Sequence, residues 1–162
     1  DINGFGGILA FRFELKKAVE TFGLVSVLYL DLDNFKPVND KYDYCTGDLV
    51  IAEALKTVRR IVGQGGELFR PHVTGDEMIS LLPNTNNSDS MRIAEDIRLA
   101  VEQYDFSVIG KGIITVTVGS ATFPETCNEW ETLENTADRI LKQAKNTKKN
   151  AVSNSILVTV GD

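Results

Sequence analysis

The strongest constraint on the fold of this chain is a short apolar run, residues 24–30, that ends directly in the acidic sequence Asp31-Leu32-Asp33. The run is rich in β-branched and aromatic residues and is too short for a globular helix, which is typical of a buried strand. Carboxylate side chains are therefore expected where a buried strand ends.

A second acidic segment, residues 74–77, lies between two more apolar runs. Residues 68–73 precede it and residues 78–82 follow it, so we predict a β-hairpin with this segment as its turn. Gly75 can adopt the positive φ that such a turn requires. Pro71 cannot donate to a strand ladder, which indicates an edge or bulge position for the first arm of the hairpin.

The two acidic segments together suggest a metal site. A hairpin tip beside the first strand end would bring Asp31, Asp76 and Glu77 around one point. Clustered carboxylates stay ionised together only with a cation, and oxygen ligands next to a phosphate favour Mg²⁺ or Mn²⁺. Each segment alone is equally consistent with ordinary solvated acids, so the hypothesis depends on the pair.

The remaining periodicity predicts an α/β fold of the α+β sandwich type. Apolar spacing indicates helices within residues 8–21, 49–62, 91–101 and 133–144, and strands within residues 113–123 and 156–160. The element order is α-β-α-β-β-α-β-α-β, with the hairpin in the middle. We therefore expect a central mixed, antiparallel-rich sheet of about five strands flanked by helices.

Several motifs follow one another along the chain in a recognisable order and spacing. They are D-L-D-x-F-K-x-x-N-D, T-G-D, a hairpin G-D-E, T-V-T-V-G-S-A, and A-D-x-x-L-x-x-A-K-x-x-x-K-N. Together they resemble the GGDEF domain family, the diguanylate cyclases and their degenerate relatives. The resemblance extends from Asp1-Ile2-Asn3-Gly4-Phe5 to Asn150-Ala151-Val152, and it implies a palm-type nucleotidyl cyclase fold.

The resemblance implies a metal and catalytic set at the two acidic segments. Asp31 and Asp76 match the family's metal-binding carboxylates, and the Leu32 carbonyl is the further oxygen ligand. Glu77 matches the acid that assists the attacking 3′-hydroxyl. The implied cofactor is Mg²⁺ or Mn²⁺, two ions per active site.

The resemblance also implies a GTP-binding set. Asn34 and Phe35 match the turn that faces the triphosphate, and Lys36 matches a phosphate-contacting lysine. Asn39 and Asp48 match the guanine-reading pair. An Asp carboxylate can accept hydrogen bonds from both N1–H and the 2-amino group of guanine, which adenine does not offer.

Further substrate contacts are implied at the hairpin turn and near the end of the chain. Thr74 and Gly75 occupy the turn that nucleotide approaches. Lys145 and Lys149 are four residues apart, which on one face of the last long helix would let both hold the β- and γ-phosphates. The second position is commonly Arg in the family, so Lys149 keeps the charge without the bidentate fork. The alternative for Lys149 is a solvated surface lysine.

The sequence departs from the family pattern at several positions. Thr74 replaces the first glycine of the signature, Met78 replaces its closing aromatic residue, and Asp43-Tyr44 replaces a glycine–histidine pair. His72 stands where an arginine is usual, and we interpret it as structural rather than as a ligand or acid. The chain contains no Arg-x-x-Asp motif, so we predict no product-inhibition site of that kind.

The resemblance predicts a diguanylate cyclase that joins two GTP molecules into cyclic di-GMP across a homodimer. The main alternative is a degenerate domain that binds GTP or serves as a regulatory or dimerisation module without synthesis. A further alternative is a nucleotidyl cyclase with another base or product.

Length, composition and net charge limit the number of domains, the location of the chain and its possible partners. The chain has 162 residues and 43% hydrophobic content, which fits a single domain over 1–162, and we expect it to be excised from a longer signalling protein with sensory domains. No apolar run approaches the roughly 20 residues of a membrane span, so we expect a cytoplasmic segment without membrane contact. The net charge of −6 argues against a nucleic-acid polymer as partner. Cys45 and Cys127 are expected to be free thiols.

Overall fold

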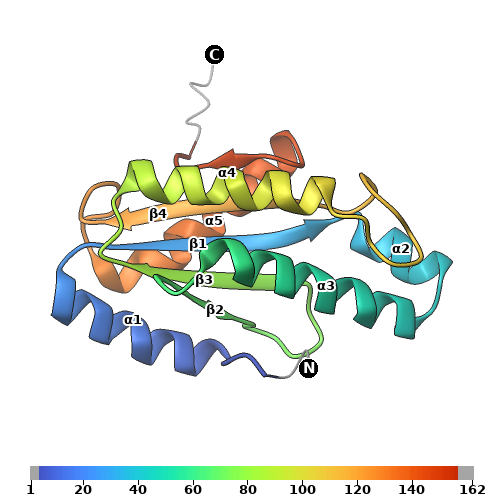
Figure 1. The fold of residues 1–162 in the computed structure, drawn as a ribbon. Coiled ribbons are helices and arrows are strands. Elements are labelled where there is room, and N and C mark those ends of the chain that lie inside the picture. Colours follow the sequence, from blue (N-terminus) through green and yellow to red (C-terminus); the bar gives the residue numbers. More distant parts are fainter. Residues whose placement is uncertain (1–3, 157–162) are drawn as a thin grey trace, which may run out of the picture.

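The computed structural model describes residues 4–156, which form five helices, a short 3₁₀ turn and five strands (Figure 1). The helices are α1 (Ile8–Phe22), α2 (Phe35–Lys41), α3 (Tyr44–Val62), α4 (Asn87–Gln103) and α5 (Leu133–Thr147), with the turn η1 (Trp130–Thr132) before α5. The strands are β1 (Val25–Asp33), β2 (Glu67–Phe69), β3 (Glu77–Pro83), β4 (Thr115–Phe123) and β5 (Val152–Ser153).

The strands make one mixed sheet in the order β2-β3-β1-β4-β5. The central strand β1 pairs antiparallel with both β3 and β4, and β5 runs parallel to β4 at one edge. The predicted fold class and antiparallel-rich sheet are confirmed.

Helices cover both faces of the sheet, so β1 is buried on its two sides. Leu28, Leu30 and Leu32 pack in a core with residues of α3 and α4. Val27 and Tyr29 pack in a second core with residues of α1 and α5. A strand buried on both faces needs a nearly continuous apolar run, which explains the sequence pattern of residues 24–30.

Helix α5 rests directly on the backbone of β4 at Gly119. A Cβ atom at this position would lie 3.0 Å from Leu141 Cα and would overlap the Ala137 carbonyl oxygen. Glycine therefore allows a close approach of helix to strand that no other residue would permit.

The hairpin differs from its prediction in length. Its first arm, β2, stops at Phe69, opposite Ile79, and residues 70–76 form a loop rather than a tight turn. The Arg70 amide donates to the Gly6 carbonyl, away from the β3 partner, and Pro71 therefore lies outside the strand. A helix, α2, also forms over Phe35–Lys41, where the sequence periodicity predicted no element.

The strand predicted at residues 156–160 is described only at its first residue. Among residues 4–156 the last strand is β5, and Ile156 is exposed and outside any strand. The rest of the strand expected at residues 156–160 lies outside the described residues. Between residues 4 and 156, no helix combines the length and the apolar content needed to cross a membrane. Both cysteines are free, Cys45 exposed and Cys127 buried.

Candidate functional site

The two acidic segments meet at one end of the sheet. In the β1–β3 register Asp31 lies directly opposite Glu77, and the Leu32 amide donates to the Asp76 carbonyl at 3.5 Å. The expected approach of the hairpin tip to the strand end is therefore present, although the tip is the longer loop 70–76.

Three carboxylates crowd this point, and their charges interact. Burial, and after it the negative charge of Asp31, raises the pKa of Asp76 to about 6. Burial and the charge of Asp31 also raise the pKa of Glu77, while nearby His72 acts in the opposite direction. One oxygen of Asp31, Oδ1, is buried and has no hydrogen-bond partner. Such a cluster favours a cation that would let all three acids ionise.

Lys145, from α5, places its ammonium group among these acceptors. Its Nζ lies 2.6 Å from Asp31 Oδ2, 3.2 Å from the Leu32 carbonyl oxygen and 3.5 Å from Asp33 Oδ1. A cation thus already binds two of the groups that were predicted to hold a metal. We conclude that this end of β1 is built to receive positive charge.

The residues fit a divalent ion of the oxygen-preferring kind. Among residues 4–156, no three His, Cys, Asp or Glu side chains are arranged to hold a metal by themselves. The set here is two carboxylates, Asp31 and Asp76, plus the Leu32 carbonyl. Mg²⁺ is often bound by one or two carboxylates together with waters and substrate phosphates, so this partial set with one free carboxylate oxygen suits it.

The turn after β1 contains Asn34 and Phe35 and leads directly into α2. Asn34 adopts a left-handed conformation with φ 63° just before α2, and its side-chain amide donates to the Ile113 carbonyl at 3.1 Å. Phe35 is half-buried and packs against the α3–α4 core. Lys36 is exposed and pairs with Asp40 at 3.1 Å, one helical turn away.

The two predicted guanine-reading residues lie close to each other. A Cβ on Gly47 would overlap the Asn39 amide oxygen, so Asn39 packs against the residue before the exposed Asp48. Asp43 begins α3 by accepting a 2.7 Å hydrogen bond from the Thr46 amide, and this hydrogen bond lowers its pKa. Asp43 therefore acts as a helix N-cap in place of the family glycine.

The same fold and motifs occur in known proteins. The profile described as "Diguanylate cyclase, GGDEF domain" matches residues 9–151. The chain belongs to the GGDEF domain family. It is 31% identical over 130 residues to diguanylate cyclase A of Treponema denticola, covering 80% of this chain and 34% of that protein. It is 34% identical over 134 residues to the biofilm architecture maintenance protein MbaA of Vibrio cholerae, covering 78% of this chain and 17% of that protein.

Solved GGDEF domains share the fold closely. The GGDEF domain of PA1120 (YfiN or TpbB) from Pseudomonas aeruginosa aligns with a TM-score of 0.86 at 24% identity, over 96% of this chain and 99% of that one. The active GGEEF domain of a Vibrio cholerae diguanylate cyclase aligns with a TM-score of 0.84 at 21% identity, over 95% and 99% of the two chains.

In this GGDEF domain residues 70–76, the signature loop, are held by an arginine that the sequence patterns did not indicate. Arg70 is buried, and its Nη2 donates to the Gly75 carbonyl at 2.8 Å. Burial lowers the pKa of Arg70, and the negative charge of Asp48 partly offsets this effect. Arg70 therefore fixes the loop at Gly75, and its charge interacts with that of the predicted guanine-reading acid. A charged residue directly after the apolar pair Leu68-Phe69 was the only sequence signal for it.

His72 and Thr74 both lie on the outer side of this loop. Although we interpreted His72 as structural, its side chain is 69% exposed, and its Nε2 lies 3.8 Å from Glu77 Oε2. Thr74 is exposed within the turn. The side chain that replaces the first signature glycine is accommodated without burial.

The two lysines do not share a helical face, which corrects the sequence prediction. Helix α5 ends at Thr147, and Lys148 adopts an extended conformation with φ −159° and ψ 119°. Lys149 therefore lies beyond the helix and is exposed, whereas Lys145 lies within it against the acids. Spacing of four residues predicted a shared face only as long as the helix continued.

Proposed function

We propose that this GGDEF domain is a diguanylate cyclase that converts two GTP molecules into cyclic di-GMP and two pyrophosphates. The observation that carries the proposal is the convergence of Asp31, Asp76 and Glu77 at one end of the sheet. Family membership supports it, and the curated relatives include a protein named diguanylate cyclase A.

In this proposal each acid has a separate task. Asp31, Asp76 and the Leu32 carbonyl would hold Mg²⁺ or Mn²⁺, two ions per site with bound nucleotide. These ions would supply charge neutralisation on the phosphates and acidification of the 3′-hydroxyl. Glu77 is half-buried and its raised pKa makes it a better proton acceptor near neutral pH, so it suits removal of the 3′-hydroxyl proton.

The substrate is positioned by the surrounding residues. Asn39 and Asp48 read guanine, and Arg70 orients the loop beside Asp48. Lys145 leaves Asp31 and, together with Lys149, holds the β- and γ-phosphates. The remaining contacts come from the two turns of the site, through Asn34, Phe35, Lys36, Thr74 and Gly75.

The reaction requires two domains. The 3′-oxygen of one GTP forms a bond with the α-phosphorus of another, and the bond to pyrophosphate breaks. A second attack closes the ring and releases the second pyrophosphate. Because each domain holds one GTP, the active species is a homodimer with the two sites face to face.

We further propose that residues 1–162 are one domain of a longer, cytoplasmic signalling chain whose other domains supply the input signal. The share of the relatives that this chain covers, 34% and 17%, supports such a setting. One solved relative is a diguanylate cyclase, SiaD, bound to its activator SiaC. We propose no partnership with nucleic-acid polymers and no membrane contact by this segment.

The decisive experiment incubates concentrated protein with radiolabelled GTP and Mg²⁺ or Mn²⁺ and resolves linear from cyclic product. Wild-type protein is expected to form cyclic di-GMP, and Asp76→Asn is expected to form at least about 100-fold less. Asp89→Asn is the matched control, because Asp89 is an exposed acid that pairs with Arg92 on α4. ATP replaces GTP in a parallel reaction, and a preference for ATP would exclude the guanine assignment.

A second function is favoured by one observation, the threonine at the first signature position. A degenerate domain would bind GTP tightly and form no product even when fused to a dimerising helix. Restoring glycine with Thr74→Gly separates the two functions, since it would create activity only in a domain that the threonine had disabled.

A further inference from the structure

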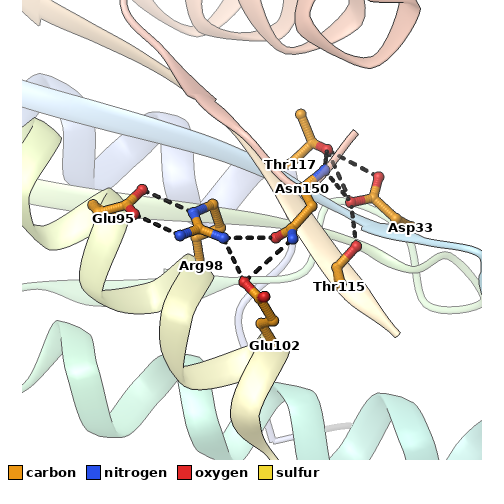
Figure 2. Close-up of polar contacts among 7 residues, drawn as sticks. All are labelled: Asp33, Glu95, Arg98, Glu102, Thr115, Thr117 and Asn150. Atoms are coloured by element: carbon orange, nitrogen blue, oxygen red, sulfur yellow. Dashed lines mark hydrogen bonds and ion pairs between the residues drawn. The ribbon is translucent and has the colours of Figure 1, made fainter. Parts of the chain in front are cut away.

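A fully buried carboxylate lies two residues beyond the metal-binding candidate of β1. Asp33 is 0% exposed and accepts hydrogen bonds from Thr115 Oγ1 at 2.8 Å and from Thr117 Oγ1 at 2.9 Å (Figure 2). Its Oδ2 also accepts from the backbone amide of Asn150 at 2.9 Å. Asp33 belongs to neither the metal-binding nor the substrate-binding set, and burying a charge is costly unless its geometry is well satisfied.

Asn150 is held at both its backbone and its side chain. Its amide nitrogen lies 3.1 Å from Thr117 Oγ1 in addition to its bond with Asp33. Its side-chain oxygen accepts from Arg98 Nη1 at 3.0 Å, and its side-chain nitrogen donates to Glu102 Oε2 at 3.2 Å (Figure 2). The residue adopts a left-handed conformation with φ 53°.

The partners of Asn150 are themselves fixed. Arg98 forms ion pairs with Glu95 at 2.6 Å and with Glu102 at 2.5 Å, both from the same helix, α4. Asp33, Thr115 and Thr117 come from β1 and β4. The network therefore ties the segment after α5 both to the sheet and to α4, which packs on the other face.

This network adjoins the two predicted phosphate-binding lysines. Lys149 directly precedes Asn150 and, being outside α5, takes its position from the backbone of this segment rather than from the helix. Lys145 Nζ lies 3.5 Å from Asp33 Oδ1. The same carboxylate thus contacts one lysine and fixes the backbone next to the other.

We propose that Asp33 and Asn150 are positioning residues that fix Lys145 and Lys149 for the β- and γ-phosphates of GTP. The inference rests on the proposed function, because it concerns the same nucleotide site. Neither residue touches the nucleotide. Asp33 acts through its contacts with Lys145 and the Asn150 amide, and Asn150 acts by holding the chain that leaves α5.

A positioning role and a purely structural role predict that nucleotide affinity depends differently on the number of phosphates in the nucleotide. Loss of lysine placement weakens binding of a triphosphate and leaves binding of a monophosphate nearly unchanged. General destabilisation of the fold affects both nucleotides alike. The informative quantity is therefore the ratio of the dissociation constants for GMP and GTP, measured in Mg²⁺ by competition against a fluorescent GTP analogue.

Two variants test the network at different atoms. Asp33→Asn keeps the size of the side chain and removes its charge. Asn150→Gly removes the contacts with Arg98 and Glu102 while tolerating the left-handed backbone. Each is expected to weaken GTP binding about tenfold, as for loss of one charge-assisted hydrogen bond, with GMP binding changed less than about twofold. If Asp33→Asn does not fold, Asn150→Gly carries the test alone.

The matched control is Ser26→Ala, at the opposite end of β1. Ser26 Oγ makes a buried 2.7 Å hydrogen bond with Thr122 Oγ1, so its loss removes a buried polar contact between the same two strands, away from the lysines. Melting temperature should fall, and the ratio of the two dissociation constants should stay at the wild-type value.

A double variant checks that Asn150 acts through Lys149. Lys149→Met alone should lower the ratio, and adding Asn150→Gly should lower it by less than the product of the two single effects. Equal losses for GTP and GMP, or full additivity, in a protein whose wild type binds GTP would overturn this inference alone. Failure of the wild type to bind GTP would overturn the proposed function and the inference together.

Discussion

The two ends of β1 contain polar groups of different kinds. At the Val25 end, buried hydroxyls satisfy one another: Ser26 bonds with Thr122, and nearby Ser90 bonds with Ser120 at 2.6 Å. At the Asp33 end, charged groups crowd together, one oxygen of Asp31 has no hydrogen-bond partner, and the pKa of Asp76 is raised to about 6. Crowded like charges with raised pKa values are found mainly at functional sites, so the contrast in charge locates the site.

The largest expected effect comes from removing an acid at the charged end. Asp76→Asn should lower cyclase turnover by at least about 100-fold, the scale for losing one preorganised electrostatic contact in an active site. Melting temperature should not fall, because the change removes repulsion from Asp31. A matching loss of thermal stability would show that Asp76 is a structural residue like those at the Val25 end.

Removing the cation at the charged end should have opposite effects on metal and nucleotide. Lys145→Met frees the oxygens of Asp31 and Leu32, so nucleotide-free protein should bind Mn²⁺ more tightly, by about tenfold for the loss of a competing charge. GTP binding should weaken. Electron paramagnetic resonance of free Mn²⁺ measures the first effect. Lys149→Met, which alters a lysine outside the acidic cluster, is the control and should leave Mn²⁺ affinity unchanged.

The pH dependence of stability should also distinguish the two ends. The pKa of Asp76 is about 6 in the folded protein and 3.8 in its unperturbed form. Between these values the folded state binds more protons, so the contribution of Asp76 to stability decreases as pH rises from about 4 to 6. After a discount for its partial exposure, the decrease is on the order of 1 kcal/mol.

Urea unfolding of wild type and Asp76→Asn between pH 4 and 7 measures this contribution. The difference between the two proteins should grow in favour of the variant as pH rises, and Mg²⁺ should reduce it. A difference that is constant with pH would mean that Asp76 titrates normally.

The smallest functional effect is expected at the neutral end. Ser90→Ala leaves the Ser120 hydroxyl buried and should lower the free energy of unfolding by about 1 kcal/mol. Cyclase turnover at a temperature where the variant is folded should equal that of the wild type. A selective loss of turnover would erase the functional distinction between the two ends.

Local sequence patterns predicted that the acids meet at the charged end, but they did not predict the end of α5 or the contact of Arg70 with the loop 70–76. The apolar runs gave β1 and β3, and their pairing brings Asp31 opposite Glu77. The end of α5 was missed because the lysine spacing looks helical, while the chain is turned at Asn150 by contacts with Asp33, 117 positions earlier. Arg70 was missed for a similar reason, since its partner Gly75 lies across a loop whose length no pattern indicated.

Gly119 affects how closely Lys145 approaches the acids at the end of β1. Helix α5 lies against bare backbone there, with Leu141 one turn before Lys145. A methyl group would lift the helix and draw the ammonium away from Asp31, which it contacts at 2.6 Å. A change at this buried, uncharged position could therefore adjust cation affinity at the acidic cluster, because it alters only the distance between α5 and β4.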